Sequence, residues 1–201
     1  MNKSTQELLM DAAKKVFAER GYAGATVKEI AEEAGVNISL VSYHFDGKDG
    51  LYRTCLEQFG EERLAFGQKI LSSPENAEDF KTKLRLWTED FLKTHVDEPE
   101  VTTILHRECV HDLTVVRDIF KNTFLKLFET VVKFLASAKK KGLLREEVDP
   151  YMAAGLFYGA LIHVGRMDKV QKEFFGKSIA DEKYRQQIVE NSIQLLLKGI
   201  T

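Results

Sequence analysis

Two short helical segments joined by a tight glycine turn constrain the fold of this chain more than any other feature. Residues 26–29, Thr-Val-Lys-Glu, form a capping-box pattern, in which Thr26 and Glu29 satisfy backbone donors at a helix start. That helix is expected to stop at Gly35, and a second helical pattern follows Asn37, a suitable N-cap, and runs through Phe45. Two helices of this length around a three-residue turn form a helix-turn-helix, whose second helix can enter the major groove of B-DNA.

The second of these helices has two chemically different faces. Val36, Val41 and Phe45 are expected to pack inward against the preceding helices. The outward positions are Ile38, Ser39, Ser42 and Tyr43, with Leu40 and His44 at the margins. A face with exposed isoleucine and tyrosine side chains is unusual on a surface that only water covers. It therefore favours DNA binding over the alternative, a plain helical hairpin.

Helical periodicity also dominates the rest of the chain, and strand-like alternation is almost absent. The first helix is expected to begin at a capping box, Ser4 to Glu7, and to stop at Gly21. Further helices are predicted at residues 48–72, 77–96, 101–112, 115–141, 150–167 and 183–199, with an irregular segment at 168–182.

The predicted fold class is therefore all-α, with about nine helices. A three-helix helix-turn-helix DNA-binding domain is expected at residues 1–47. A larger helical effector-binding and dimerisation domain is expected at residues 48–201, and the helix at 48–72 connects the two.

Composition excludes several classes of protein. Two cysteines, Cys55 and Cys109, are too few for a disulfide framework, and residues 1–20 lack the pattern of a signal peptide. The longest uncharged run, residues 150–165, is shorter than the ~20 residues that span a bilayer, so no membrane partner is expected, and the low cysteine count favours a reduced, cytoplasmic location. Residues 1–50 hold six basic and eight acidic side chains, so net charge does not indicate nucleic-acid binding.

A more specific pattern lies between Thr5 and about Phe59. It consists of Phe17, Gly21, Thr26, Ile30-Ala31, Ala34-Gly35-Val36, Tyr43-His44-Phe45, Lys48 and Leu51 in this order. Together these residues resemble the TetR (TetR/AcrR-like) family of transcriptional regulators. A weaker similarity covers residues 142–159, and residues 60–140 match nothing specific.

The resemblance implies a role in DNA binding for ten residues. They are Thr26, Lys28, Asn37, Ile38, Ser39, Leu40, Ser42, Tyr43, His44 and Lys48. Thr26, also a helix cap, and Lys28 would contact phosphates, and Lys48 would meet a phosphate at the start of the fourth helix. Positions 38–40 and 42 would face bases, whereas Tyr43 and His44 would contact the backbone. Leu40 and Ser42 depart from the small residue and the tyrosine or asparagine that many members carry, so few hydrogen bonds to bases are expected.

The resemblance also implies a two-fold dimer on a near-palindromic operator and a small-molecule effector. The expected dimer interface is Leu156, Leu161, Ile188, Val189, Ile193, Leu196 and Leu197, for which the alternative is intramolecular core. The expected effector pocket is Trp87, Phe91, His106, Phe124, Phe128, Tyr158 and His163, for which the alternative is again core packing. The aromatic side chains favour an apolar or aromatic ligand.

The leading hypothesis is a dimeric repressor that a small ligand releases from its operator. A same-fold activator or a ligand-independent regulator is the alternative, followed by a helical module or an enzyme without DNA binding. No glycine-rich phosphate loop, nucleophile elbow or catalytic triad is evident, so neither catalysis nor a cofactor is expected. A metal site at His106, Cys109 and His111 is disfavoured, because His111 is turned away from Cys109 on a helix.

Overall fold

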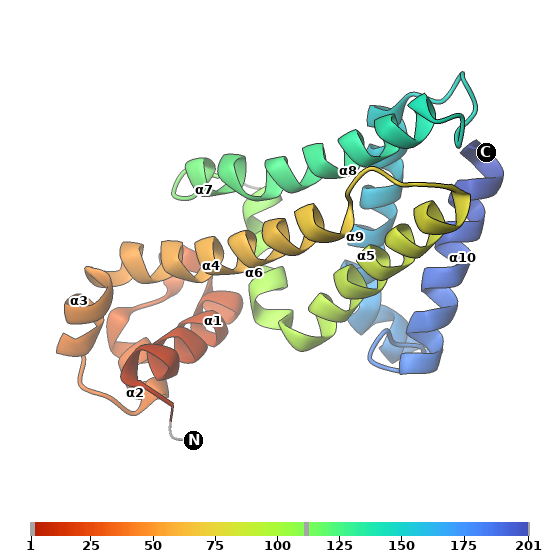
Figure 1. Ribbon diagram of the computed structural model, residues 1–201. Coiled ribbons are helices and arrows are strands. Elements are labelled where there is room, and N and C mark those ends of the chain that lie inside the picture. The colour runs from red at the N-terminus through yellow and green to blue at the C-terminus, as the bar shows by residue number, and fades with distance from the viewer. Residues whose placement is uncertain (1–2, 111–112, 201) are drawn as a thin grey trace. The chain divides into compact units, whose positions relative to one another are not determined.

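The computed structural model describes residues 3–110 and 113–200, and within these ranges it contains ten α-helices and no strand (Figure 1). The helices are α1 (Thr5–Gly24), α2 (Val27–Ala34), α3 (Ser39–Phe45), α4 (Gly47–Ile70), α5 (Ala77–Asp97), α6 (Pro99–Val110), α7 (Arg117–Asn122), α8 (Phe124–Lys140), α9 (Pro150–Phe175) and α10 (Glu182–Ile200). The all-α prediction is confirmed.

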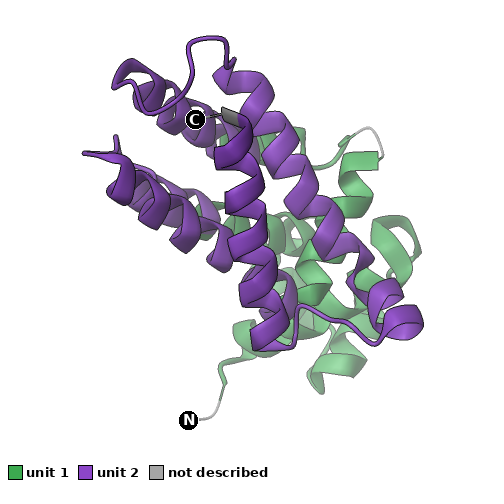
Figure 2. Cartoon of the chain, turned by 90° about the vertical axis from the view of Figure 1, so that its right-hand side faces the viewer, with its two compact units in different colours: residues 1–62, 98–123 green, residues 63–97, 124–201 purple. Residues whose placement is uncertain are grey.

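The chain packs into two compact units, coloured separately in Figure 2. Unit 1 combines residues 1–62 with residues 98–123, and unit 2 combines residues 63–97 with residues 124–201. Unit 1 is therefore discontinuous in sequence: α6 and α7 pack with the N-terminal helices, although α5 separates them along the chain. This division follows the packing of the helices. It differs from the expected domain boundary at residue 47, which separates the predicted DNA-binding residues from the predicted effector and dimer residues.

The predicted start and stop signals of the N-terminal helices are confirmed. The Glu7 amide donates to Ser4 Oγ at 3.3 Å, and the Glu29 amide donates to Thr26 Oγ1 at 3.2 Å. Gly21 interrupts α1 with φ of 73°, and Gly35 ends α2 in the left-handed conformation with φ of 66°. Both positions require a residue without a Cβ penalty at positive φ.

Two of the predicted helix boundaries are wrong. The helix expected at 115–141 is divided at Thr123, whose hydroxyl donates to the Ile119 carbonyl where the chain leaves unit 1. The helix expected to end at 167 continues to Phe175, where Gly176 adopts a left-handed conformation. Residues 168–175 have no inward apolar stripe, but they include good helix formers and no glycine or proline, so the helix continues.

The core of unit 2 is formed by α5, α8, α9 and α10. Its fully buried side chains include Phe80, Leu84, Phe134 and Leu161, and the Phe80 and Phe134 rings stack with their centroids 5.1 Å apart. In unit 1, α6 lies against α1, and the buried residues of α1 and α4 face each other around Phe17 and Tyr52.

The two cysteines differ in environment, which leads to a prediction about their reactivity. Cys55 has no exposed surface, its Sγ lies 3.7 Å from Met10 Sδ, and burial raises the pKa of its thiol to about 12, whereas Cys109 is exposed. In native protein at pH 8, a disulfide reagent is expected to label Cys109 at least roughly a hundredfold faster than Cys55, because the thiolate is the reactive form. Release of the chromophore should show one rapid thiol per chain, and Cys109→Ser should abolish it. Two rapid thiols in native protein would contradict the buried position of Cys55.

Candidate nucleic-acid interface

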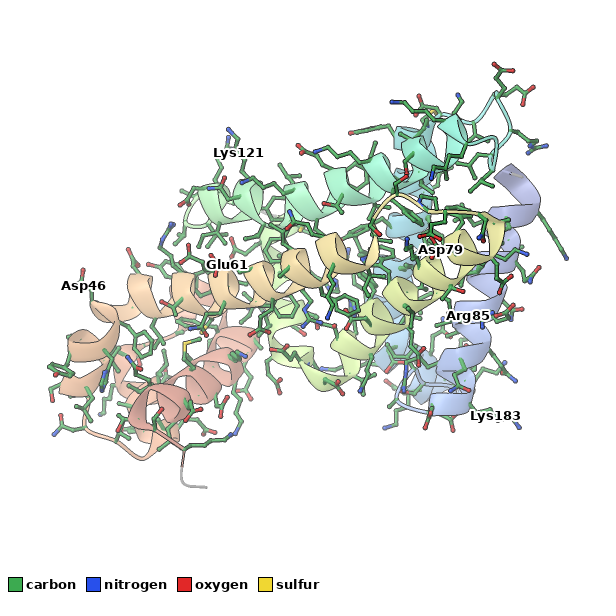
Figure 3. All side chains as sticks on the ribbon, viewed as in Figure 1. Asp46, Glu61, Asp79, Arg85, Lys121 and Lys183 are labelled. Atoms are coloured by element: carbon green, nitrogen blue, oxygen red, sulfur yellow. The ribbon has the colours of Figure 1, made fainter. Side chains whose placement is uncertain are left out.

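Each helix of the helix-turn-helix buries an apolar side chain, and both helices pack against α1. Ile30 of α2 and Val41 of α3 have no exposed surface. The N-cap of α3 is Ile38 and not Asn37 as expected, but Asn37 still bonds to the start of the helix: its Oδ1 accepts the Ser39 amide at 2.9 Å and the Ser39 hydroxyl at 2.8 Å. At the other end, Asp46, labelled in Figure 3, closes α3 in the left-handed conformation with φ of 57°.

The outward face of α3 agrees with the predicted division of the helix. Tyr43 is 80% exposed and Ile38 is 50% exposed. Asn37, Ser39 and Ser42 are also exposed, whereas Leu40 and His44 are half-buried at the margins. The Tyr43 ring meets the His44 ring edge-to-face with the centroids 4.8 Å apart, so these aromatic side chains support each other.

The three predicted phosphate contacts have different surroundings. The Thr26 hydroxyl, which accepts the Glu29 amide, also donates to Glu29 Oε2 at 2.8 Å, so its capping role is confirmed. Lys28 is highly exposed, and its ammonium lies 3.8 Å from Glu32, a pair that water screens strongly. The side chain of Lys28 therefore has the freedom that a phosphate contact needs.

Lys48 has a structural role that sequence reasoning missed. Its ammonium donates to the carbonyls of Tyr22 at 2.9 Å and Ala25 at 3.1 Å, and it lies 4.5 Å from the centre of the Tyr22 ring. These contacts use two of the three N–H donors of the ammonium. Lys48 thus ties the start of α4 to the turn between α1 and α2.

Contacts from α6 to α1 and α4 were also missed. The Arg107 guanidinium donates to the carbonyls of Phe17 at 2.8 Å and Ala18 at 2.6 Å, near the end of α1. The Tyr52 hydroxyl of α4 donates to Glu108 at 2.6 Å, and burial together with this carboxylate raises the tyrosine pKa. No sequence signal marks these pairs, because the partners of Arg107 lie 89 and 90 residues away.

Four of the residues predicted to line an effector pocket come together in unit 2. The Trp87 ring lies 5.6 Å from Phe91 and 5.7 Å from Tyr158, and Tyr158 lies 6.0 Å from Phe128. His95 joins them, with its ring 5.0 Å from Phe91. Burial lowers the pKa of His95, which favours a neutral imidazole at pH 7. Sequence reasoning missed His95.

The other predicted pocket residues lie elsewhere. Phe124 is buried at the start of α8, and His163 is exposed on α9. His106 is half-buried on α6, in unit 1. The predicted set is therefore divided between two units, because helix spacing along a sequence does not reveal which unit a helix joins.

The predicted dimer interface requires correction at four positions. Leu161, Val189, Ile193 and Leu197 are buried in the core of their own chain, so the alternative reading as intramolecular core is correct for them. Ile188 and Leu196 are half-buried against the same core. Leu156 differs, because 76% of its surface is exposed on α9, and Tyr151 and Met152 of the same helix are 65% and 66% exposed.

No group of three or more histidine, cysteine or acidic side chains in residues 3–110 and 113–200 is arranged to hold a metal ion. His111, considered above as a ligand, lies outside the described residues. In the same residues, no helix has the length and apolar character needed to cross a membrane.

Comparison with known proteins relates the helix-turn-helix region to a family of regulators. The family described as "Bacterial regulatory proteins, tetR family" matches residues 9–55. The chain is 25% identical over 195 residues to the HTH-type transcriptional regulator RutR of Escherichia coli (strain K12), covering 97% of this chain and 90% of RutR. It is 27% identical over 138 residues to the probable HTH-type transcriptional regulator YttP of Bacillus subtilis (strain 168), covering 66% of this chain and 65% of YttP.

Solved structures share the whole fold. The fatty acid degradation regulator FadR from Bacillus halodurans superposes with a TM-score of 0.76 at 19% identity, over 99% of this chain and 97% of FadR. The matched N-terminal region is the one that holds the helix-turn-helix and its exposed α3 face. Residues 9–55 are thus similar to the tetR family of bacterial regulatory proteins, and RutR, which matches the chain over almost its whole length, is an HTH-type transcriptional regulator.

Proposed function

We propose that this regulator is a homodimeric repressor that leaves a near-palindromic operator when a small apolar or aromatic molecule binds. The observation that carries DNA recognition is the exposed face of α3, where Ile38, Ser39, Ser42 and Tyr43 project from a helix anchored by buried Val41. Residues 1–47 would carry the DNA contacts, and residues 48–201 would carry the effector and dimer functions, with α4 connecting them. The protein would bind this DNA in the cytoplasm.

The exposed apolar side chains of α9 support the dimer. Tyr151, Met152 and Leu156 are each at least 65% exposed, and Leu195 of α10 is 75% exposed. Apolar side chains of this size, gathered on one helix, are typical of a surface that a partner covers. A two-fold dimer would present two α3 helices to half-sites one or more helical turns apart.

The aromatic cluster of unit 2 supports the choice of ligand class. Trp87, Phe91, Phe128 and Tyr158 offer flat apolar surfaces, and His95 adds a neutral polar group beside them. A ligand among these rings would act only by binding better to the conformation with low DNA affinity. Ligand and operator must then weaken each other's binding by the same factor.

Binding of the purified protein to the intergenic DNA beside its own gene, at two salt concentrations, tests the proposal. A protected near-palindrome would establish the operator and the half-site spacing, and it would provide the assay for an effector screen. Reporter expression with and without the gene then separates a repressor from an activator. Sequence-independent binding that vanishes as salt rises would argue against operator recognition on this DNA.

Tyr43→Ala is expected to weaken operator binding by roughly thirtyfold, since two copies would each lose a backbone contact, about 2 kcal/mol in total. The thermal midpoint should stay within about 2 °C of the wild type, because Tyr43 is 80% exposed. Titration of labelled operator measures the affinity, and circular dichroism measures the midpoint. Unchanged affinity would remove Tyr43 from the interface.

A further inference from the structure

We propose that α3 reads its half-site chiefly through the methyl groups of thymine, with Ile38 as the main contact and Leu40 as a second contact on the other margin of the helix. The inference rests on the proposed operator binding and names the base chemistry that this site recognises. Thymine carries the one apolar group that a base presents in the major groove of unmodified DNA. An apolar side chain can therefore discriminate thymine from the other bases there.

Two polar groups at the start of α3, the side-chain oxygen of Asn37 and the hydroxyl proton of Ser39, are engaged within the protein. Asn37 Oδ1 accepts both the amide and the hydroxyl of Ser39, at 2.9 Å and 2.8 Å. An asparagine reads adenine by donating and accepting at once. With its oxygen occupied by Ser39, Asn37 lacks the acceptor half of that pair, and the Ser39 hydroxyl has already given its proton.

The remaining side chains of α3 also cannot form the bidentate hydrogen bonds by which proteins most often recognise guanine and adenine. Residues 38–45 are Ile-Ser-Leu-Val-Ser-Tyr-His-Phe, a segment without arginine, lysine, glutamine or asparagine. Guanine is read most often by a bidentate arginine or lysine, and adenine by a bidentate asparagine or glutamine. Within α3, His44 is half-buried against the Tyr43 and Phe45 rings.

Ile38 is placed where a methyl contact would form. It directly precedes α3, and half of its surface is exposed. Recognition helices of this motif contact base edges with the residues at this end. Leu40 is half-buried on the opposite margin of the exposed face, because residues two apart on a helix do not share a face, so it offers a second and separate apolar contact. Covering a thymine methyl would remove apolar surface from water on both partners.

Deoxyuridine provides the test, because it lacks the methyl of thymine but keeps the same base pairing and the O4 acceptor. After the operator is mapped, each thymine is replaced singly by deoxyuridine and the affinity of the full-length protein is measured. At one or more thymines of each half-site, the replacement is expected to weaken binding by about fourfold, and by about fifteenfold when both half-sites are changed. Deoxyuridine outside the half-sites is the DNA control.

Variants assign the contact to a side chain. Ile38→Ala is expected to bind the unmodified operator more weakly and to lose its response to deoxyuridine at the sensitive thymine. Leu86→Ala, the matched control at an apolar side chain of α5 that is 47% exposed, should keep the full response. Ile38 is half-exposed, so the alanine variant should fold, which circular dichroism checks.

The outcomes separate this inference from the proposed function. A wild-type protein without any sequence preference would defeat operator binding itself. A protein that binds its operator but loses less than twofold with every deoxyuridine would overturn methyl reading and leave operator binding intact. The inference would also be overturned if Ile38→Ala and Leu40→Ala both kept the full loss of affinity that deoxyuridine causes in the wild type. Other residues would then contact the thymine methyls.

Discussion

Gly50→Ala is expected to abolish operator binding and to lower the thermal midpoint by about 10 °C. Gly50 lies in the first turn of α4, and the end of α3 packs directly on its backbone. A Cβ at this position would overlap the Phe45 carbonyl oxygen and lie 2.9 Å from the carbonyl carbon. Backbone cannot rotate away as a flexible side chain can, so α3 must shift against α4. Overpacking of this kind costs about 3 kcal/mol.

The matched control is Gly24→Ala in the same unit. A Cβ at Gly24 would meet Arg20 Cβ at 3.5 Å, an ordinary contact distance. This variant should keep the operator affinity and thermal midpoint of the wild type. The two proteins are compared by operator titration and by thermal unfolding. Wild-type binding by Gly50→Ala would show that α3 does not depend on its contact with α4.

Arg107→Ala is expected to destabilise the protein by about 3 kcal/mol and to weaken operator binding. The variant removes two charge-assisted hydrogen bonds to the Phe17 and Ala18 carbonyls, each worth roughly 1.5–3 kcal/mol before the partial exposure of the site is considered. It also removes the guanidinium that packs against Gly21, where a Cβ would lie 3.1 Å from Nη1. Urea unfolding followed by circular dichroism measures the loss.

Arg85→Ala is the control for removing an arginine. Arg85, labelled in Figure 3, pairs with Glu190 at 2.9 Å, and both side chains are about half exposed. An exposed pair of this kind contributes about 0.5 kcal/mol or less. Arg107→Lys keeps the charge without the planar fork and should recover only part of the stability. Equal losses for Arg85→Ala and Arg107→Ala would show that the α6 contact adds nothing to stability.

Local signals in the sequence were sufficient to predict the helix-turn-helix. The capping boxes at Ser4 and Thr26, the turn at Gly35 and the inward position of Val41 all depend on residues within a few positions of one another. For such features the chemistry of the segment decides the structure. The exposed face of α3, including Ile38, could be derived for the same reason.

Features that depend on distant partners could not be derived. Leu161 and Val189 have the apolar spacing of helices that pack, and this spacing is the same for a core and for a dimer interface. The two bonds from Arg107 and the attachment of Lys48 to the α1–α2 turn join residues far apart in sequence. The local sequence indicates that each of these residues packs or forms hydrogen bonds. It does not identify the distant residue that is the partner.

The discontinuity of unit 1 has a consequence for how this protein is made on the ribosome. The N-terminal helices are synthesised first, but the segment at 98–123 that completes their unit follows only after α5. Until then the face of α1 that α6 covers has no partner in the nascent chain. Unit 1 therefore matures late in translation, and a chain truncated before α6 would emerge with its earliest-made part unfinished.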